Sequence, residues 1–595
     1  MGKEIEKESR LERGLKLPEL TSRLAREDPE RARELLDGLP LSARVQVVLE
    51  RPAKERMELI LLSEESGALT QALPEEEWWR TLKEVGEEDA LPLVAMASSE
   101  QITFLVDLEW WYRDILDPLM VIRWWVLFLE AGPEVLPRWL EPADEELLVL
   151  SLAKFLEVYV ADPDDLGYET WRRLQLFSLD NTYFFHFRDP NLGPHLEQVL
   201  RVLRNSFQDR YYTILDRVRT CVPAEEEETA ARLRRGRLLD HGFPEFEEAI
   251  IIYAYLSQER MRALEQAGQP RPGKAERPAG ESAPRYDLVP TDLPALLGRA
   301  LARIEDPAAL EEFRFQFARL ANRVLVADAA DLSKLENLAS AVDKVYGYLE
   351  IGLDAWSEGD PARGRRLLEE QWLPHIFQAG YSQALRLHRR AERLLQEGWL
   401  RQVEQPLDLL EEPIGPILEG LLKKRPAWYA GPDDKGTRVF REFRSLREVR
   451  RAEAALEQAE FLGKLFFEAL GLEAGDLPEL EHLNLSALTW TAVLLTALVR
   501  GALYQRFCFA PLAASDLDRM IKEIFANGLP RRVRPELREV WAEWLGRRLK
   551  RLDPKLKAAG WAFFEKSLQR LEDEFSRLDP TALDIRYIST LIVRS

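Results

Sequence analysis

Residues 144–160, which read DEELLVLSLAKFLEVYV, carry the pattern that decides the fold. Apolar side chains recur here at steps of one to four residues, which is the spacing of one wide face of an α-helix. These side chains are Leu147, Leu148, Leu150, Leu152, Phe155, Leu156 and Val160. Sustained two-residue alternation, which marks strands, is scarce in the rest of the chain. We therefore expect a helix over 144–160 and an all-α fold.

Helix starts are marked along the whole sequence by Asp-Pro pairs. Asp is a favoured N-cap because its carboxylate accepts the free N–H groups of the first turn, and Pro suits the next position. The pairs begin at residues 28, 117, 162, 189, 306, 360, 553 and 579. Between about 73 and 160 we expect short helices that start near 74, 87, 98, 117, 133 and 144. Because such helices cannot bury their apolar faces alone, this stretch predicts a superhelix of stacked helices.

Two segments depart from this pattern. In 176–187, aromatic residues flank Asp180-Asn181, a pair that tolerates positive φ, so we expect a small β-hairpin. Residues 268–284 read GQPRPGKAERPAGESAP and have no large apolar side chain, so 266–285 is predicted to be a linker. The expected organisation is an N-terminal helical domain (1–265), this linker, and a second helical domain (286–595).

The composition limits the classes of protein. The formal net charge of −21 argues against a nucleic-acid binder, which needs a basic surface. Residues 483–499 are uncharged but too short and too polar to span a membrane, so we expect a buried helix there and no membrane insertion. The charged start, MGKEIEKESR, has no signal-peptide core, and only Cys221 and Cys508 occur. These features favour a cytoplasmic protein.

No catalytic, cofactor or metal signature is recognisable in the sequence. The histidines have no HExxH or other close ligand spacing, and no Gly-x-Ser-x-Gly motif occurs. The histidines are His186, His195, His241, His375, His388 and His482. We therefore assign no catalytic residue, no metal ligand and no cofactor. An enzyme whose active site is assembled from distant residues remains an alternative.

Three tryptophan pairs lie in the short-helix region. They are Trp78-Trp79, Trp110-Trp111 and Trp124-Trp125. Adjacent helical residues point about 100° apart, so each pair can contact two neighbouring helices. Packing between stacked helices is the main interpretation, and an exposed aromatic binding surface is the alternative.

Arginines recur every three residues from Arg438 to Arg450, with Arg451 adjacent. On an α-helix a step of three residues drifts by about 60°, so only a subset such as Arg444, Arg447 and Arg451 shares a face. A helix with many ion pairs is one interpretation. A binding face for an anion or an acidic partner is the other.

Several stretches resemble a known family. They are SLDNTYFFHF (178–187), REFRSLREVRRAEAALE (441–457), LLTALVRG (494–501) with APL (510–512), and LDIRYISTLIV (583–593). Together they resemble an uncharacterised bacterial family of large helical proteins, classed as a domain of unknown function. Residues 73–160 also resemble the N-terminal helical superhelix of MgtE-type magnesium transporters. The first resemblance implies a helical fold and brings no site residues.

From these features we expect a non-catalytic scaffold or regulatory protein that binds another protein through its helical surface. A ligand- or cation-responsive regulator with an anion-binding arginine face is the first alternative, and an enzyme with a dispersed active site is the second.

Overall fold

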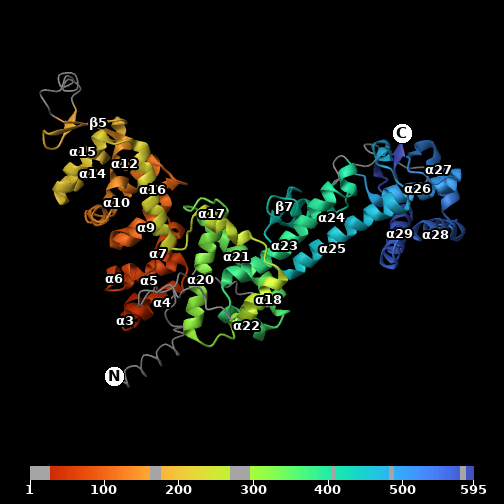
Figure 1. The fold of residues 1–595 in the computed structure, drawn as a ribbon, viewed down its shortest axis with the longest axis horizontal. Helices are drawn as coiled ribbons and strands as arrows, with labels where there is room; N and C mark the ends of the chain where they lie inside the picture. Colours follow the sequence, from red (N-terminus) through yellow and green to blue (C-terminus); the bar gives the residue numbers. More distant parts are fainter. Residues whose placement is uncertain are drawn as a thin grey trace. The chain divides into compact units, whose positions relative to one another are not determined.

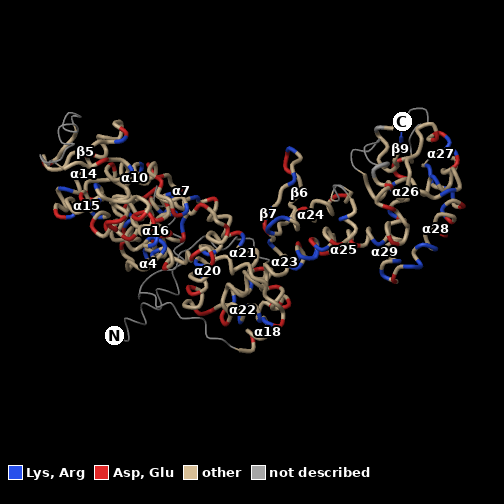
Figure 2. Tube along the Cα trace, turned by 45° about the horizontal axis from the view of Figure 1, so that its top comes forward, with Lys and Arg blue, Asp and Glu red and all other residues tan. Residues whose placement is uncertain are grey.

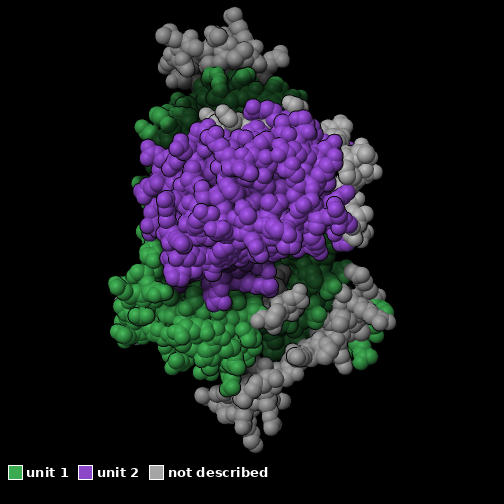
Figure 3. All heavy atoms as spheres, turned by 90° about the vertical axis from the view of Figure 1, so that its right-hand side faces the viewer, with its two compact units in different colours: residues 1–378 green, residues 379–595 purple. Residues whose placement is uncertain are grey.

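The computed structural model describes residues 27–160, 176–267, 295–403, 407, 409–480, 488–528, 530–576 and 585–594. Two compact units, residues 1–378 and 379–595, are coloured separately in Figure 3. The boundary between them lies within α23 (Leu373–Gln396). The predicted linker at 266–285 lies almost entirely outside the described residues, so the predicted domain boundaries stay a prediction.

Unit 1 begins with a series of short helices (Figure 1). They are α3 (Pro29–Asp37), α4 (Leu41–Leu49), α5 (Ala53–Leu62), α6 (Ser66–Gln71), α7 (Glu75–Val85), α8 (Leu91–Met96), α9 (Ser99–Glu109), α10 (Pro118–Ala131), α11 (Val135–Leu140) and α12 (Glu145–Phe155). Each helix from α3 to α10 packs against the helix two positions further on. The odd-numbered helices α3 to α11 thus form one column and the even-numbered helices α4 to α12 form a second. The predicted stacking of short helices is confirmed, and it begins well before residue 73.

The Asp-Pro pairs start helical segments as predicted. Each Asp that lies within the described residues accepts a hydrogen bond from a backbone N–H of the following first turn. These are Asp28, Asp117, Asp189, Asp306, Asp360 and Asp553. The pairs at 162 and 579 lie outside the described residues. Ser98 and Gln101 form the reciprocal capping box that starts α9.

The predicted hairpin at 176–187 is confirmed and has a third strand. β4 (Phe177–Ser178) and β5 (Tyr183–Phe187) are antiparallel, and β3 (Leu156–Val160) pairs with the other edge of β5. The helix expected over 144–160 therefore ends at Phe155, and that part of the prediction was wrong. Leu-Glu-Val-Tyr-Val alternates buried and partly exposed residues, and β-branched and aromatic residues of this kind favour a strand beside an available edge.

The remainder of unit 1 contains longer helices and one more hairpin. β1 (Trp111–Tyr112) and β2 (Ile115–Leu116) form the hairpin between α9 and α10. The other elements are η1 (Pro190–Leu192), α14 (Gly193–Ser206), α15 (Gln208–Thr220), α16 (Pro223–Asp240), α17 (Phe246–Ala249), η2 (Ile250–Tyr253), α18 (Gln258–Ala267), α19 (Leu296–Leu301), α20 (Pro307–Ala327), α21 (Leu335–Ser357) and α22 (Pro361–Glu370). Of these, α16 packs against α12 and α9, and α17 packs against α20.

Unit 2 is also mainly helical. Its elements after α23 are η3 (Trp399–Gln402), α24 (Ile414–Leu421), β6 (Trp428–Pro432), β7 (Arg438–Arg441), α25 (Leu446–Gly463), η4 (Lys464–Ala469), η5 (Ala474–Glu479), α26 (Trp490–Tyr504), β8 (Leu512–Ala513), η6 (Ala514–Asp516), α27 (Leu517–Ile524), α28 (Pro535–Leu549), α29 (Pro554–Phe575), η8 (Ile585–Tyr587) and β9 (Val593–Arg594). The apolar helix α26 is buried against α27 and α29, as expected for the uncharged stretch before Arg500. Among the described helices, none is long and apolar enough to cross a membrane.

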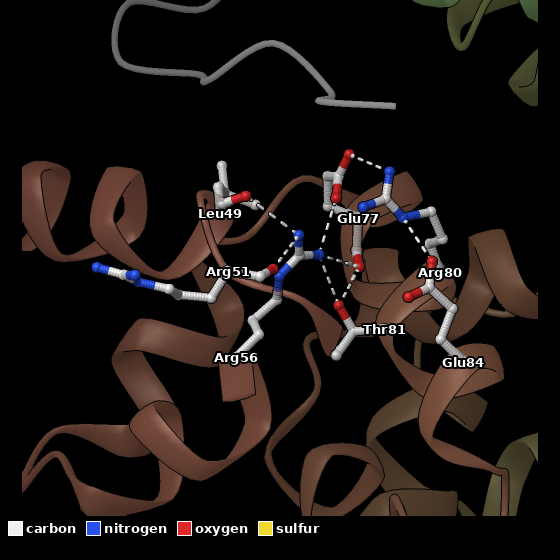
Figure 4. A network of polar contacts seen from close by, with 7 residues as sticks. All are labelled: Leu49, Arg51, Arg56, Glu77, Arg80, Thr81 and Glu84. Carbon is white, nitrogen blue, oxygen red and sulfur yellow. Dashed lines mark hydrogen bonds and ion pairs between the residues drawn. The ribbon is translucent and has the colours of Figure 1, made fainter. Parts of the chain in front are cut away.

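A buried ion pair fixes the first column of helices (Figure 4). The side chains of Arg56 on α5 and Glu77 on α7 are both fully buried, and Arg56 Nη1 donates to Glu77 Oε2 at 2.8 Å. The same guanidinium donates to Thr81 Oγ1 at 2.8 Å and to the carbonyl oxygen of Leu49 at 3.2 Å. One side chain thus joins the end of α4, the body of α5 and the first two turns of α7.

We expect Glu77→Gln to lower the free energy of unfolding by about 3–5 kcal/mol, because it leaves a buried guanidinium without its carboxylate. Urea denaturation followed by circular dichroism measures the change. Glu64→Gln is the matched control, since Glu64 faces Arg33 at 3.9 Å on the surface. An exposed pair of this kind contributes about 0–1 kcal/mol. Equal effects of the two substitutions would contradict a stabilising role for the buried pair.

Candidate functional site

Helix α16 contributes side chains to two cavities of unit 1. Arg234 Nε donates to the carbonyl oxygen of Asp107 at 2.6 Å, and its Nη1 donates to that of Arg113 at 2.9 Å. These bonds attach α16 to the end of α9 and to the β1–β2 turn. Residues on one face of α16 line an apolar groove, and residues on another face line an acidic pocket.

The apolar groove has a volume of about 710 Å³. It is lined by Trp111, Tyr112, Arg113, Asp114, Arg234, Arg235, Leu238, Phe243, Pro244, Glu245, Phe246, Glu247, Val326, Ala329, Ala330, Asp331 and Leu332. Tyr112 on the hairpin side and Phe246 on the α17 side are large apolar side chains that remain exposed. Exposed aromatic side chains beside a cavity of this size are typical of a binding surface.

The charges around the apolar groove differ between its two sides. On the hairpin side, Arg235 pairs with Asp114 at 3.2 Å, and Arg113 is exposed. On the α17 side, Glu245 and Glu247 are exposed and have no cationic partner within the part of the chain that the structure describes. The α17 rim therefore offers two carboxylates to a basic group of a ligand.

The acidic pocket has a volume of about 370 Å³. It is lined by Glu75, Ser99, Glu100, Thr103, Phe104, Val106, Asp107, Trp139, Pro142, Ala143, Asp144, Leu147, Arg237, Asp240 and His241. Carboxylates outnumber the cationic side chains in this lining, so the pocket favours a cationic ligand over an anionic one.

Arg237 neutralises two of the carboxylates in the acidic pocket. Its Nε and Nη2 donate to the two oxygens of Asp107 at 2.7 and 2.8 Å, and its Nη1 donates to Asp144 at 2.6 Å. Burial raises the pKa of Asp107 above its ordinary value, although the hydrogen bonds and charge of Arg237 lower it. This bridge fixes α16 to α9 and to the start of α12.

His241, at the C-terminal end of α16, lies beside the glutamates of α7. Its Nδ1 is 2.9 Å from Glu76 Oε1 and its ring packs against Phe104, with centroids 4.6 Å apart. Its backbone oxygen accepts a hydrogen bond from Asn322 Nδ2 at 2.7 Å. Burial lowers the pKa of His241, but the hydrogen bond and charge of Glu76, together with the charges of Glu75 and Asp107, raise the pKa overall. Among the described residues, Glu75, Glu76 and His241 have the donor atoms that could hold a metal ion, all within 4.8 Å of one another.

The six tryptophans predicted as a candidate aromatic surface are buried. They are Trp78, Trp79, Trp110, Trp111, Trp124 and Trp125. Trp79 Nε1 donates to Glu109 Oε1 at 2.9 Å, and Trp110 packs edge-on against Trp125. The alternative of an exposed aromatic surface was wrong, because each of these indoles is at most 5% exposed. Trp111 lines the apolar groove.

The predicted arginine face does not lie on a single helix. Arg444 precedes the N-cap Ser445, whose side chain accepts from the backbone N–H of Glu448, so α25 begins only at Leu446. Arg441, earlier in the same row, ends β7. Arg444, Arg447 and Arg451 are all exposed, with Arg447 and Arg451 on α25. Figure 2 shows acidic residues interspersed with the basic ones in this region. The shared helical face of all three was therefore wrong, and their role in anion or partner binding stays a prediction.

Sequence reasoning missed both cavities. Glu76 and His241 are 165 residues apart in the chain, and no local spacing signals their contact. The exposed Tyr112 and Phe246 come from a short hairpin and a short helix that no motif marks.

The described fold and cavities define an all-α protein of packed helices with an apolar groove and a separate acidic pocket. The chain belongs to the family of unknown function DUF6178, whose family model matches residues 24–594. This confirms the resemblance to an uncharacterised family. Searches of curated proteins and of solved structures found no match. The comparisons do not show the resemblance of 73–160 to the MgtE superhelix.

We expect Arg237→Gln to destabilise the protein by about 3 kcal/mol at pH 7, because Asp107 then carries a buried charge without its main partner. Loss of Arg237 raises the pKa of Asp107 further, so acidification neutralises this carboxyl and the deficit relative to wild type shrinks toward pH 5. Urea denaturation of both proteins at pH 7 and pH 5 measures this.

Arg235→Gln on the same helix is the control, because Arg235 pairs with the exposed Asp114. Its effect is expected to stay within about 1 kcal/mol at either pH. A deficit for Arg237→Gln that is the same at both pH values would exclude the charge of Asp107 as its cause.

Proposed function

We propose that the chain is a non-catalytic cytoplasmic scaffold or regulatory protein that binds a segment of a partner protein in the apolar groove. The observation that carries this proposal is the combination of the groove's volume, about 710 Å³, with exposed aromatic side chains on both of its sides. A partner segment that buries Tyr112 and Phe246 removes apolar area from water, at roughly 25 cal/mol per Å².

The chemistry of the groove suggests the composition of that segment. Its apolar floor, which includes Trp111, Leu238 and Phe243, suits aliphatic or aromatic side chains. The unpaired carboxylates of Glu245 and Glu247 suit a lysine or arginine at one end of the segment. We infer an apolar segment with a flanking basic residue, whose orientation is set by the α17 rim.

A ligand- or cation-responsive regulator is the second candidate function. The acidic pocket favours it, because His241 and several carboxylates line a cavity of about 370 Å³. The pocket replaces the arginine face as the basis for this alternative.

A photo-reactive benzoylphenylalanine at position 112, 246 or 61 tests the scaffold proposal in the cells from which the chain comes. Positions 112 and 246 should cross-link to the same segment of one protein, because both side chains face the groove. Position 61 is the matched control, since Leu61 and Phe246 are both 45% exposed and Leu61 lies on α5. Adducts from 112 and 246 that are no more frequent than those from 61 would contradict a groove partner.

The cross-linked segment, made as a fluorescent peptide, then gives affinities by polarisation. Phe246→Asp should weaken binding at least about tenfold, or roughly 1.4 kcal/mol, because it places a charge in the apolar contact. Leu61→Asp should leave the affinity within about twofold, which is less than roughly 0.5 kcal/mol.

A further inference from the structure

The first turn of α7 places two consecutive glutamates beside one histidine. Glu75 lines the acidic pocket, while the side chain of Glu76 is mostly buried behind it. A carboxylate oxygen of each and a ring nitrogen of His241 all lie within 4.8 Å of one another. The three residues come from two elements, α7 and the end of α16, that other contacts hold in place.

These contacts restrict His241 strongly. Phe104 packs against its ring, and Asn322 binds its backbone oxygen. The next residue, Gly242, has φ +83°, and a Cβ there would lie 2.9 Å from the Cα of Arg319. The imidazole is thus preorganised, which lowers the cost of using it as a ligand.

The donor set distinguishes between cations. An imidazole nitrogen suits zinc and its first-row neighbours, whereas magnesium and calcium take oxygen ligands almost exclusively. Zinc–ligand distances near 2.0–2.2 Å place tetrahedral donor atoms about 3.4 Å apart. The separation between Nδ1 of His241 and Oε1 of Glu76, 2.9 Å, is already slightly below that. Glu75 is half-buried, and its carboxylate oxygen, within 4.8 Å of the other two donors, would have to move closer to them to complete the set.

We propose that Glu75, Glu76 and His241 bind a divalent transition-metal ion of the zinc class. Three protein ligands leave a fourth position, and the ion would expose it to the acidic pocket, where Glu75 and His241 are part of the lining. Sites with three protein ligands and an open position bind water or a small ligand there. The ion would replace the hydrogen bond between His241 and Glu76 and would tie α7 to the end of α16.

The histidine–carboxylate contact alone does not account for this arrangement. A single ion pair requires one carboxylate, which Glu76 supplies. Glu75 adds a second carboxylate oxygen to the same cluster, within 4.8 Å of the other two donor atoms. A divalent ion balances both charges.

Zinc titration of the full-length, tag-free chain after treatment with a chelator tests the site. Competition with a fluorescent zinc indicator should give about one tightly held Zn²⁺ per chain, and Mg²⁺ at the same concentration should not displace it. Glu75→Gln and His241→Gln should each weaken zinc binding by at least about tenfold, since even outer-shell changes cost 10–100-fold. Glu100→Gln is the control, because Glu100 lines the same pocket outside the triad. The zinc affinity of this variant should stay within about twofold of that of the unmutated chain.

The proposal would be overturned if Glu75→Gln and His241→Gln both bound zinc as tightly as the unmutated chain. It would also be overturned if the unmutated chain bound zinc with a dissociation constant above about 100 µM, because structural and catalytic zinc sites have far lower dissociation constants. Circular dichroism shows whether each variant is folded. If His241→Gln unfolds, the zinc affinity of Glu75→Gln tests the proposal, because this substitution leaves the contact between Glu76 and His241 intact. The peptide-binding groove is tested separately, so failure of the metal site leaves the scaffold proposal standing.

Discussion

The buried pair between Arg56 and Glu77 is the constraint on which the first turn of α7 depends. A carboxylate and a guanidinium removed from water are costly unless they are paired and hydrogen-bonded, and here Thr81 and backbone oxygens accept from the two terminal nitrogens of Arg56 as well. The neighbours of Glu77 in the chain, Glu75 and Glu76, lie beside His241, and Glu75 also lines the acidic pocket. The glutamates also lie at the positive end of the helix dipole, where negative charge is favoured.

Helix α16 is the structural constraint on which the two cavities depend. Arg234 and Arg237 attach it to α9 at neighbouring points, through the carbonyl oxygen and the carboxylate of Asp107. One face is then available to the groove and another to the pocket. A ligand that moves the end of α16 would act on both cavities, since Leu238 lines the groove and His241 lines the pocket only three residues later.

Local features of the sequence predicted most of the fold. The Asp-Pro caps and the Ser98 capping box specify helix starts through contacts within a few residues, so they were readable without tertiary information. The hairpin at 176–187 was readable for the same reason. Leu156–Val160 was not, because its apolar spacing fits a helix equally well and only the edge of β5 decides in favour of a strand. The regular spacing of arginines predicted a helix that includes Arg444. The capping signal at Ser445, in the sequence Ser-Leu-Arg-Glu, instead starts the helix after Arg444.

The candidate sites were not predictable because none of their contacts is local. The apolar groove combines a hairpin, one face of α16 and the connection between α20 and α21. Only the fold shows that Tyr112 and Phe246 stay exposed. The tryptophan pairs are the opposite case. Tryptophan is common at binding surfaces, but these side chains lie in the core of the fold. Aromatic content therefore indicates a site only after burial is known, and the exposed aromatics beside the groove, Tyr112 and Phe246, are single residues at the ends of short elements rather than the tryptophan pairs.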